Sequence, residues 1–137
     1  MDKIITVEFQ GQTFSFYNTP TAPTLIKEIF SDNYEVLKKG IEFSSGDVIL
    51  DIGACEGMFS VMMSKLFPQT RIIAIEPIPR TFNQLDQNIK LNGCKNIEAY
   101  NIGIGKKGQK TITMNVSKEQ SGGSTALCTF VPTDHYQ

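Results

Sequence analysis

The sequence predicts an α/β fold with a doubly wound, mostly parallel sheet, preceded by a β-hairpin and a helix. Two observations predict it. Short runs of consecutive apolar residues, typical of strands buried on both faces, alternate with segments whose apolar residues recur at helical spacing. The joints between these segments are short and contain Gly or Pro, as in strand–helix–strand units. A length of 137 residues corresponds to one such domain.

The elements follow one another in the order that this fold requires. β-Branched and aromatic runs on both sides of Gly11, between Ile4 and Phe16, indicate a hairpin. Helical spacing begins at Thr24 and is expected to end near Gly40. We expect core strands at 48–50, 71–75 and 97–104, helices at 58–67 and 80–92, and a further strand at 108–117. The chain then divides into an N-terminal hairpin and helix (1–45) and a partial main domain (46–137), whose sheet is truncated after the third core strand.

Composition and charge exclude several classes of function. Hydrophobic residues make up 40% and charged residues 20% of the chain, which is typical of a soluble globular protein. The formal net charge of −1 offers no positive field to a polyanion, so no nucleic-acid partner is expected. No apolar run is long enough for a membrane span, and the N-terminus does not resemble a signal peptide. The three cysteines form no C-x-x-C pair, which favours reduced thiols in the cytoplasm and indicates no metal site.

A glycine-containing loop followed by an acid marks the candidate site. Asp51 ends the first predicted core strand, and Gly53 and Gly57 lie in the loop that leads into the next helix. Glycine allows a sharp turn and the close approach of a ligand, and the start of the helix presents free N–H groups. Glu76 ends the second strand, 19 residues after Gly57, and its carboxylate can accept hydrogen bonds from both hydroxyls of a ribose. The pattern therefore predicts a cofactor that contains a nucleoside.

The same loop discriminates between two such cofactors. The dinucleotide fingerprint G-x-G-x-x-G has its middle glycine where this loop has Cys55. Asp51 precedes the first glycine, and its carboxylate would repel a pyrophosphate but attract the ammonium and sulfonium groups of S-adenosylmethionine. The sequence therefore favours S-adenosylmethionine over NAD, and an NAD-binding oxidoreductase is the weaker alternative.

The sequence resembles the FkbM family of S-adenosylmethionine-dependent methyltransferases over about residues 46–125. The resemblance is carried by DIGACEG (51–57), IEP (75–77), NIKLNG (88–93) and NIGIGKKG (101–108). The first two of these motifs are shared widely among class I methyltransferases, whereas the Glu-Pro and Leu-Asn-Gly pairs in the sequence point to this family. The resemblance implies a Rossmann-like methyltransferase fold and O-methylation of a hydroxyl on a small molecule or sugar.

The resemblance also implies a set of cofactor contacts. Asp51, Gly53 and Gly57 would line the methionine part of the cofactor. Glu76 would hold the ribose, and Asn101 and Ile102 would lie near the adenine. The expected cofactor-binding residues are Asp51, Gly53, Ala54, Cys55, Gly57, Glu76, Pro77, Asn101 and Ile102. The sequence offers no candidate base for the hydroxyl proton, so no catalytic residue is named.

One motif of the family is missing from the sequence. FkbM members carry a segment similar to Lys-Ile-Asp-x-Glu-Gly on the fourth strand, and this chain has none. We therefore expect the N-terminal, cofactor-binding half of a methyltransferase, inactive by itself. Without a fourth strand beside residues 48–50, the open sheet edge is expected to favour association with a second copy. A non-catalytic binding or assembly module that retains the cofactor pocket is the alternative function.

Overall fold

Three parallel strands form the sheet that carries the site. β3 (Val48–Ile52) pairs with β4 (Arg71–Ile75), and β4 pairs with β5 (Ile97–Tyr100), so the strand order is β3-β4-β5. β3 and β4 are rich in β-branched residues, which favour the extended backbone. This computed structural model describes residues 3–31, 41–109, 111–114 and 128–130.

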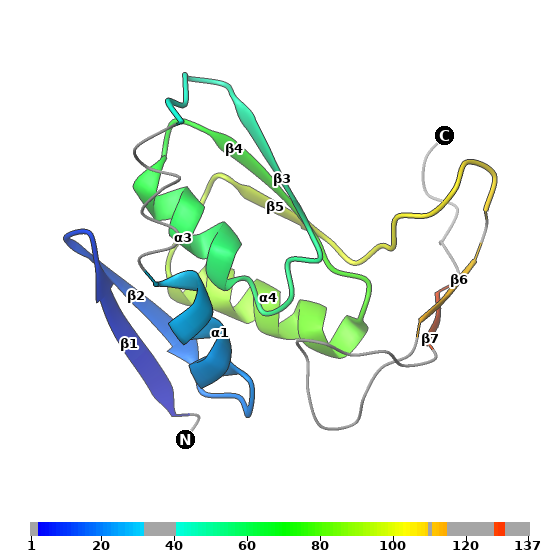
Figure 1. Ribbon diagram of the computed structural model, residues 1–137, viewed down its shortest axis with the longest axis horizontal. Coiled ribbons are helices and arrows are strands. Elements are labelled where there is room, and N and C mark those ends of the chain that lie inside the picture. The colour runs from blue at the N-terminus through cyan, green and yellow to red at the C-terminus, as the bar shows by residue number, and fades with distance from the viewer. Residues whose placement is uncertain (1–2, 32–40, 110, 115–127, 131–137) are drawn as a thin grey trace.

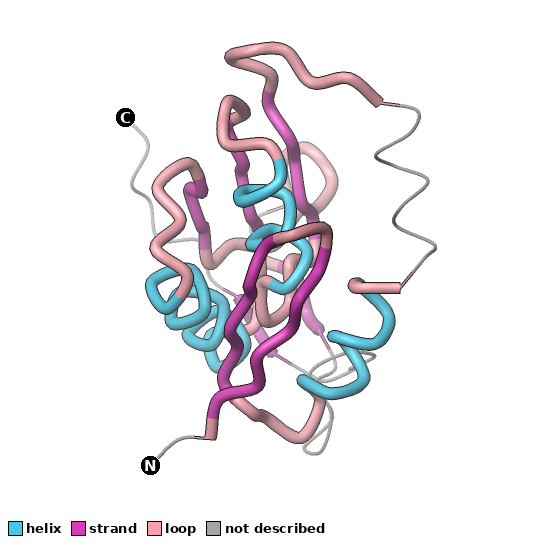
Figure 2. Tube along the Cα trace, turned by 90° about the vertical axis from the view of Figure 1, so that its left-hand side faces the viewer, coloured by secondary structure: helices cyan, strands magenta, loops and turns pink. Residues whose placement is uncertain are grey.

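The helices lie between this sheet and the N-terminal hairpin. α3 (Met58–Leu66) and α4 (Pro79–Leu91) cover one face of the sheet (Figure 1). β1 (Ile4–Phe9) and β2 (Gln12–Tyr17) form an antiparallel hairpin that packs on the far side of both helices. α1 (Ala22–Ile29) lies against α3. Figure 2 shows the hairpin, the helices and the sheet one behind another. None of the described helices is long and apolar enough to cross a membrane.

The core lies between these layers. Strand alternation turns Ile49, Ile72 and Ile97, which are aligned across the sheet, toward the helices. On the hairpin side, Phe14 and Phe16 of β2 are fully buried in the same core cluster. The residues predicted as an N-terminal unit (1–45) and as the main domain thus share one core, and their division at residue 45 stays a prediction.

The predicted α/β fold is confirmed, with differences at the ends of elements. α1 begins at Ala22 rather than Thr24, because Pro23 suits the first turn of a helix. β5 ends at Tyr100, where the side-chain amide of Asn101 donates to the backbone oxygen of Glu76 (2.8 Å). Within the strand expected at 108–117, the structure describes β6 (Ile112–Met114), which pairs antiparallel with β7 (Cys128–Phe130), and residues 110 and 115–117 lie outside the described residues. The helix end expected near Gly40 lies outside the described residues.

The second face of the sheet is uncovered within the described residues. Alternation directs Val48, Leu50 and Ile52 of β3 away from the helices, and these residues are 53%, 53% and 59% exposed. In the part of the chain that the structure describes, β3 pairs with β4 alone, so its other edge has no strand beside it. Parallel sheets are normally covered on both faces. The described helices therefore cover only one face of the sheet. On the other face, the exposed side chains of β3 are apolar, and the exposed ion pair of Arg71 and Glu98 lies beside them on β4 and β5.

Two asparagines, Asn88 of α4 and Asn92 at the C-cap of this helix, join the hairpin to the rest of the fold. Asn92 accepts a hydrogen bond from the N–H of Ser15 (3.0 Å) and donates to its backbone oxygen (2.6 Å), as a neighbouring strand would. Asn88 is fully buried; it accepts from the N–H of Tyr17 (3.1 Å) and donates to the backbone oxygen of Glu56 (2.8 Å). The NIKLNG segment thereby connects β2 to the loop between β3 and α3.

Replacing Asn88 with alanine should destabilise the protein by about 1–3 kcal/mol, because the N–H of Tyr17 and the backbone oxygen of Glu56 lose this buried partner. Urea unfolding measures the change. Gln87→Ala, at an exposed position of the same helix, is the matched control and should change the free energy of unfolding by no more than about 0.5 kcal/mol. An Asn88→Ala midpoint equal to that of the control would contradict the joining role of Asn88.

The open face of β3 should make the chain self-associate. We expect light scattering at micromolar concentration to report a species larger than the monomer, and Leu50→Lys to shift it toward the monomer, because a lysine resists burial. Ile4→Lys changes an apolar residue of β1 that is 45% exposed, and this control should leave the association unchanged. A monomeric wild-type chain would show that the open face does not drive association.

Candidate functional site

The loop from β3 to α3 contains three residues in the left-handed conformation. Gly53, Cys55 and Gly57 have φ values of +82°, +52° and +85°. A Cβ on Gly57 would clash with Cδ1 of Leu85 and would lie 3.5 Å from the Cα of Leu85, so glycine at this position lets α4 approach the loop. No atom would lie within 4 Å of a Cβ on Gly53. The two glycines therefore differ in role: Gly57 serves packing against α4, and Gly53 leaves its backbone accessible.

The carboxylate of Glu76 fixes the conformation of this loop. Its Oε2 accepts from the N–H of Cys55 (3.0 Å) and its Oε1 from the N–H of Ile78 (2.9 Å), and the residue is only 5% exposed. Burial raises the pKa of Glu76 above its ordinary value, against the effect of the two N–H donors, and the charge of Asp51 adds to the increase. Because Asn101 donates to the backbone oxygen of Glu76, these two predicted site residues are neighbours.

Cys55 contributes its backbone rather than its thiol. Burial raises the pKa of the thiol to about 11, and the neighbouring carboxylates of Glu56, Glu76 and Asp51 raise it as well. The thiol therefore stays protonated at neutral pH and is a poor nucleophile. Its left-handed backbone conformation directs the N–H toward Glu76.

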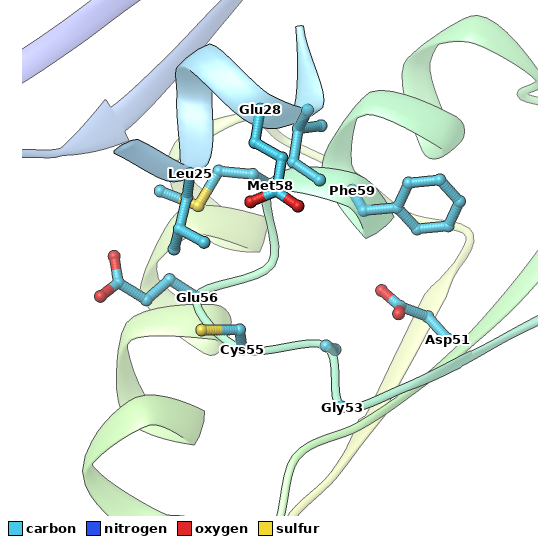
Figure 3. Close-up of a pocket in the computed structure, with 10 residues that line it drawn as sticks. Leu25, Glu28, Asp51, Gly53, Cys55, Glu56, Met58 and Phe59 are labelled. Carbon is cyan, nitrogen blue, oxygen red and sulfur yellow. The ribbon is translucent and has the colours of Figure 1, made fainter. Parts of the chain in front are cut away.

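A cavity of about 370 Å³ lies at the carboxyl end of β3 (Figure 3). This volume lies within the range of small-molecule sites. The cavity is lined by Leu25, Glu28, Ile29, Asp51, Gly53, Ala54, Cys55, Glu56, Met58 and Phe59. Of the predicted site residues, those lining it are Asp51, Gly53, Ala54 and Cys55. Gly57 and four other predicted site residues do not line the cavity. These four follow β4 and β5 at the same edge of the sheet: Glu76, Pro77, Asn101 and Ile102.

Of the described residues that line the cavity, those with charged side chains are all carboxylates. Oδ2 of Asp51 accepts from Oγ of Ser60 (2.5 Å), and burial raises the pKa of Asp51 above its ordinary value of 3.8. Figure 3 shows Glu28 directed into the cavity from α1, across from Asp51 and Gly53. Such a wall attracts a cationic ligand and repels a phosphate. Within the described residues, no group of three or more His, Cys, Asp or Glu is placed to hold a metal ion.

Sequence reasoning missed two parts of this site, the wall formed by α1 and the role of Glu56. Glu56 is 2% exposed, and its carboxylate accepts from Oγ1 of Thr19 (2.7 and 2.9 Å) and from Oγ1 of Thr21 (2.5 Å). These hydrogen bonds tie the start of α1 to the glycine loop. An acid between small residues in a predicted buried loop was a signal for Glu56, because buried acids need partners. The position of α1 had no local signal.

Replacing Asp51 with asparagine should stabilise the ligand-free protein. Asparagine keeps an acceptor for Ser60 and removes a charge that burial disfavours. The folded state holds the Asp51 proton to higher pH than the unfolded chain, so stability decreases as pH rises from 3.8 through the raised pKa. The melting temperature of the variant relative to wild type should therefore increase across this window and then level off.

Asp86→Asn is the control for this experiment, because Asp86 is an exposed carboxylate paired with Lys90 (2.5 Å). Loss of this ion pair should lower the free energy of unfolding by no more than about 1 kcal/mol, so the control should show no increase in melting temperature. A melting temperature of Asp51→Asn below that of wild type at neutral pH would contradict the assignment of Asp51 as a destabilising charge.

Comparison with known proteins identifies the family. The family described as TRM5/TYW2 methyltransferase domain matches residues 25–116, which include every residue that lines the cavity. Methyltransferase 1 of Beauveria bassiana is 32% identical over 117 residues, which are 82% of this chain and 45% of that protein. The 31-O-demethyl-FK506 methyltransferase FkbM of Streptomyces tacrolimicus is 37% identical over 78 residues, which are 57% of this chain and 30% of that protein.

Among solved structures, a transferase of Pyrococcus horikoshii shares the fold, with a TM-score of 0.50 and 23% identity over 75% of this chain and 37% of that one. The chain spans less than half the length of the curated relatives that it matches. The predicted resemblance to FkbM is confirmed by the identity to that protein. The chain therefore belongs to the S-adenosylmethionine-dependent methyltransferases, as a domain of the TRM5/TYW2 family with FkbM among its relatives.

Proposed function

We propose that the cavity binds S-adenosylmethionine. The observation that carries the proposal is that, among the described residues, the charged lining consists of Glu28, Asp51 and Glu56, without a lysine or arginine. The cofactor carries an ammonium and a sulfonium, which this lining attracts. Its methionine end would lie beside Asp51 and Gly53, and its nucleoside would extend toward Glu76, whose carboxylate has acceptor capacity left for the ribose. When bound, the cofactor supplies an activated methyl group.

The proposed reaction is O-methylation of a small molecule or sugar. A hydroxyl oxygen of the acceptor forms the new bond to the methyl carbon, the bond from that carbon to sulfur breaks, and the hydroxyl proton passes to a base. The name of the relative FkbM refers to a 31-O-demethyl compound, which supports an oxygen acceptor. The net charge of −1 supports a small acceptor over a nucleic acid. We also propose a cytoplasmic location, which the free thiols of Cys55 and Cys94 support.

Two other functions are open to test. An NAD-binding oxidoreductase is disfavoured, because the acidic lining of the cavity would face a pyrophosphate. A non-catalytic module would bind the cofactor without transferring its methyl group. Transfer of a labelled methyl group to a panel of hydroxylated small molecules, with RNA as a second panel, separates these functions. A labelled ether supports O-methylation, and labelled RNA would overturn the proposed acceptor class.

Calorimetric titration tests the cofactor directly. S-Adenosylhomocysteine should bind with a micromolar dissociation constant, and NAD should not bind under the same conditions. Asp51→Asn should weaken S-adenosylhomocysteine binding about tenfold, because a charge-assisted contact to the ammonium is worth about 1.5–3 kcal/mol in full and part of it survives in the amide. Asp86→Asn, which changes an exposed carboxylate outside the cavity, is the control. Preferential binding of NAD, or binding of neither ligand to the folded chain, would overturn the proposal.

A further inference from the structure

α1 supplies one wall of the cavity, and this wall carries a carboxylate. Leu25, Glu28 and Ile29 line the cavity from α1, opposite the loop that begins with Gly53. Figure 3 shows the carboxylate of Glu28 directed into the space above that loop. Among the described residues, no hydrogen bond or ion pair of the Glu28 side chain is found, and its backbone oxygen accepts from Oγ of Ser31 (2.8 Å). The side chain is thus available to a ligand in the cavity.

The position of α1 is fixed at both ends. At its N-terminal end, Thr19 and Thr21 donate to the buried carboxylate of Glu56 in the glycine loop. At its C-terminal end, the ring of Phe30 packs against Phe14 of the hairpin, with ring centroids 5.0 Å apart. A helix anchored in this way holds Glu28 at the cavity without the need for a movement on binding.

We propose that Glu28 and Asp51 together recognise the ammonium of the amino-acid tail of the cofactor, from opposite walls of the cavity. This inference rests on the proposed function and adds α1 to the cofactor site. The cavity, the glycine loop and the match to the methyltransferase family support a cofactor site at this place. The two carboxylates would determine that the ammonium end of the cofactor lies between them. Among the described residues no lysine or arginine lines the cavity, so a bound ammonium would be attracted by both carboxylates without a competing cation from these residues.

The inference also gives a reason for the hydrogen bonds of Glu56. Because Glu56 lines the cavity but directs its carboxylate to Thr19 and Thr21, its charge is engaged in holding α1. Glu56 is thus a positioning residue for Glu28. The two carboxylates that remain for the ligand come from different elements, β3 and α1.

Two ligands that differ only in the amino-acid tail provide the test. S-Adenosylhomocysteine carries the ammonium, and 5′-methylthioadenosine has the same nucleoside and thioether without the tail. Calorimetry with the wild-type chain and with Glu28→Gln and Glu28→Lys should show S-adenosylhomocysteine binding weakened about three- to tenfold by glutamine and more by lysine. Binding of 5′-methylthioadenosine should be unchanged. Glu42→Gln makes the same change at an exposed residue outside the cavity and should alter neither affinity.

The outcomes separate this inference from the proposed function. If the wild-type chain binds S-adenosylhomocysteine and the Glu28 variants bind it equally well, the role of Glu28 is overturned and the cofactor proposal stands. If the substitutions lower the affinity for both ligands equally, Glu28 supports the shape of the cavity and does not bind the ammonium. That result also overturns the inference. If the folded wild-type chain binds neither ligand, both proposals fail. Melting temperatures of the variants should match wild type, since Glu28 is exposed.

Discussion

The buried carboxylate of Glu56 joins the parts of the chain that form the cavity. Its side chain accepts hydrogen bonds from Thr19 and Thr21, and its backbone oxygen accepts from Asn88 of α4. A carboxylate that is 2% exposed is stable only with such partners, so the glycine loop, the segment before α1 and α4 must come together for the fold to form. The walls of the cavity are therefore positioned by one polar network and not by independent elements.

The acids of the site are placed where folding alone would not favour them. Burial raises the pKa of both Asp51 and Glu76, which means that their ionised forms are less favourable in the folded protein than in water. Glu76 recovers part of this cost by fixing the backbone of Cys55 and Ile78. Asp51 has Ser60 as a donor and otherwise faces the cavity. A charge held at a cost to stability is typical of residues kept for binding.

The sheet shows two contrasting faces. Toward the helices, Ile49, Ile72 and Ile97 lie in a continuous core, whereas Val48, Leu50 and Ile52 on the other face are more than half exposed. The matched part of this chain spans less than half the length of these curated relatives, and the site lies at the carboxyl end of β3, beside this open edge.

The sequence by itself determined the parts of this protein that depend on neighbours along the chain. Apolar runs and turn residues predicted the parallel sheet and its helices, and the motif 51–57 predicted the loop whose residues Asp51, Gly53, Ala54 and Cys55 line the cavity. Tertiary structure alone decided that Glu28 lies across from Asp51, that Gly57 serves the packing of Leu85, and that Asn88 binds both β2 and the loop. These contacts join segments far apart in sequence, and their geometry follows from how the hairpin and helices pack, which no local pattern encodes.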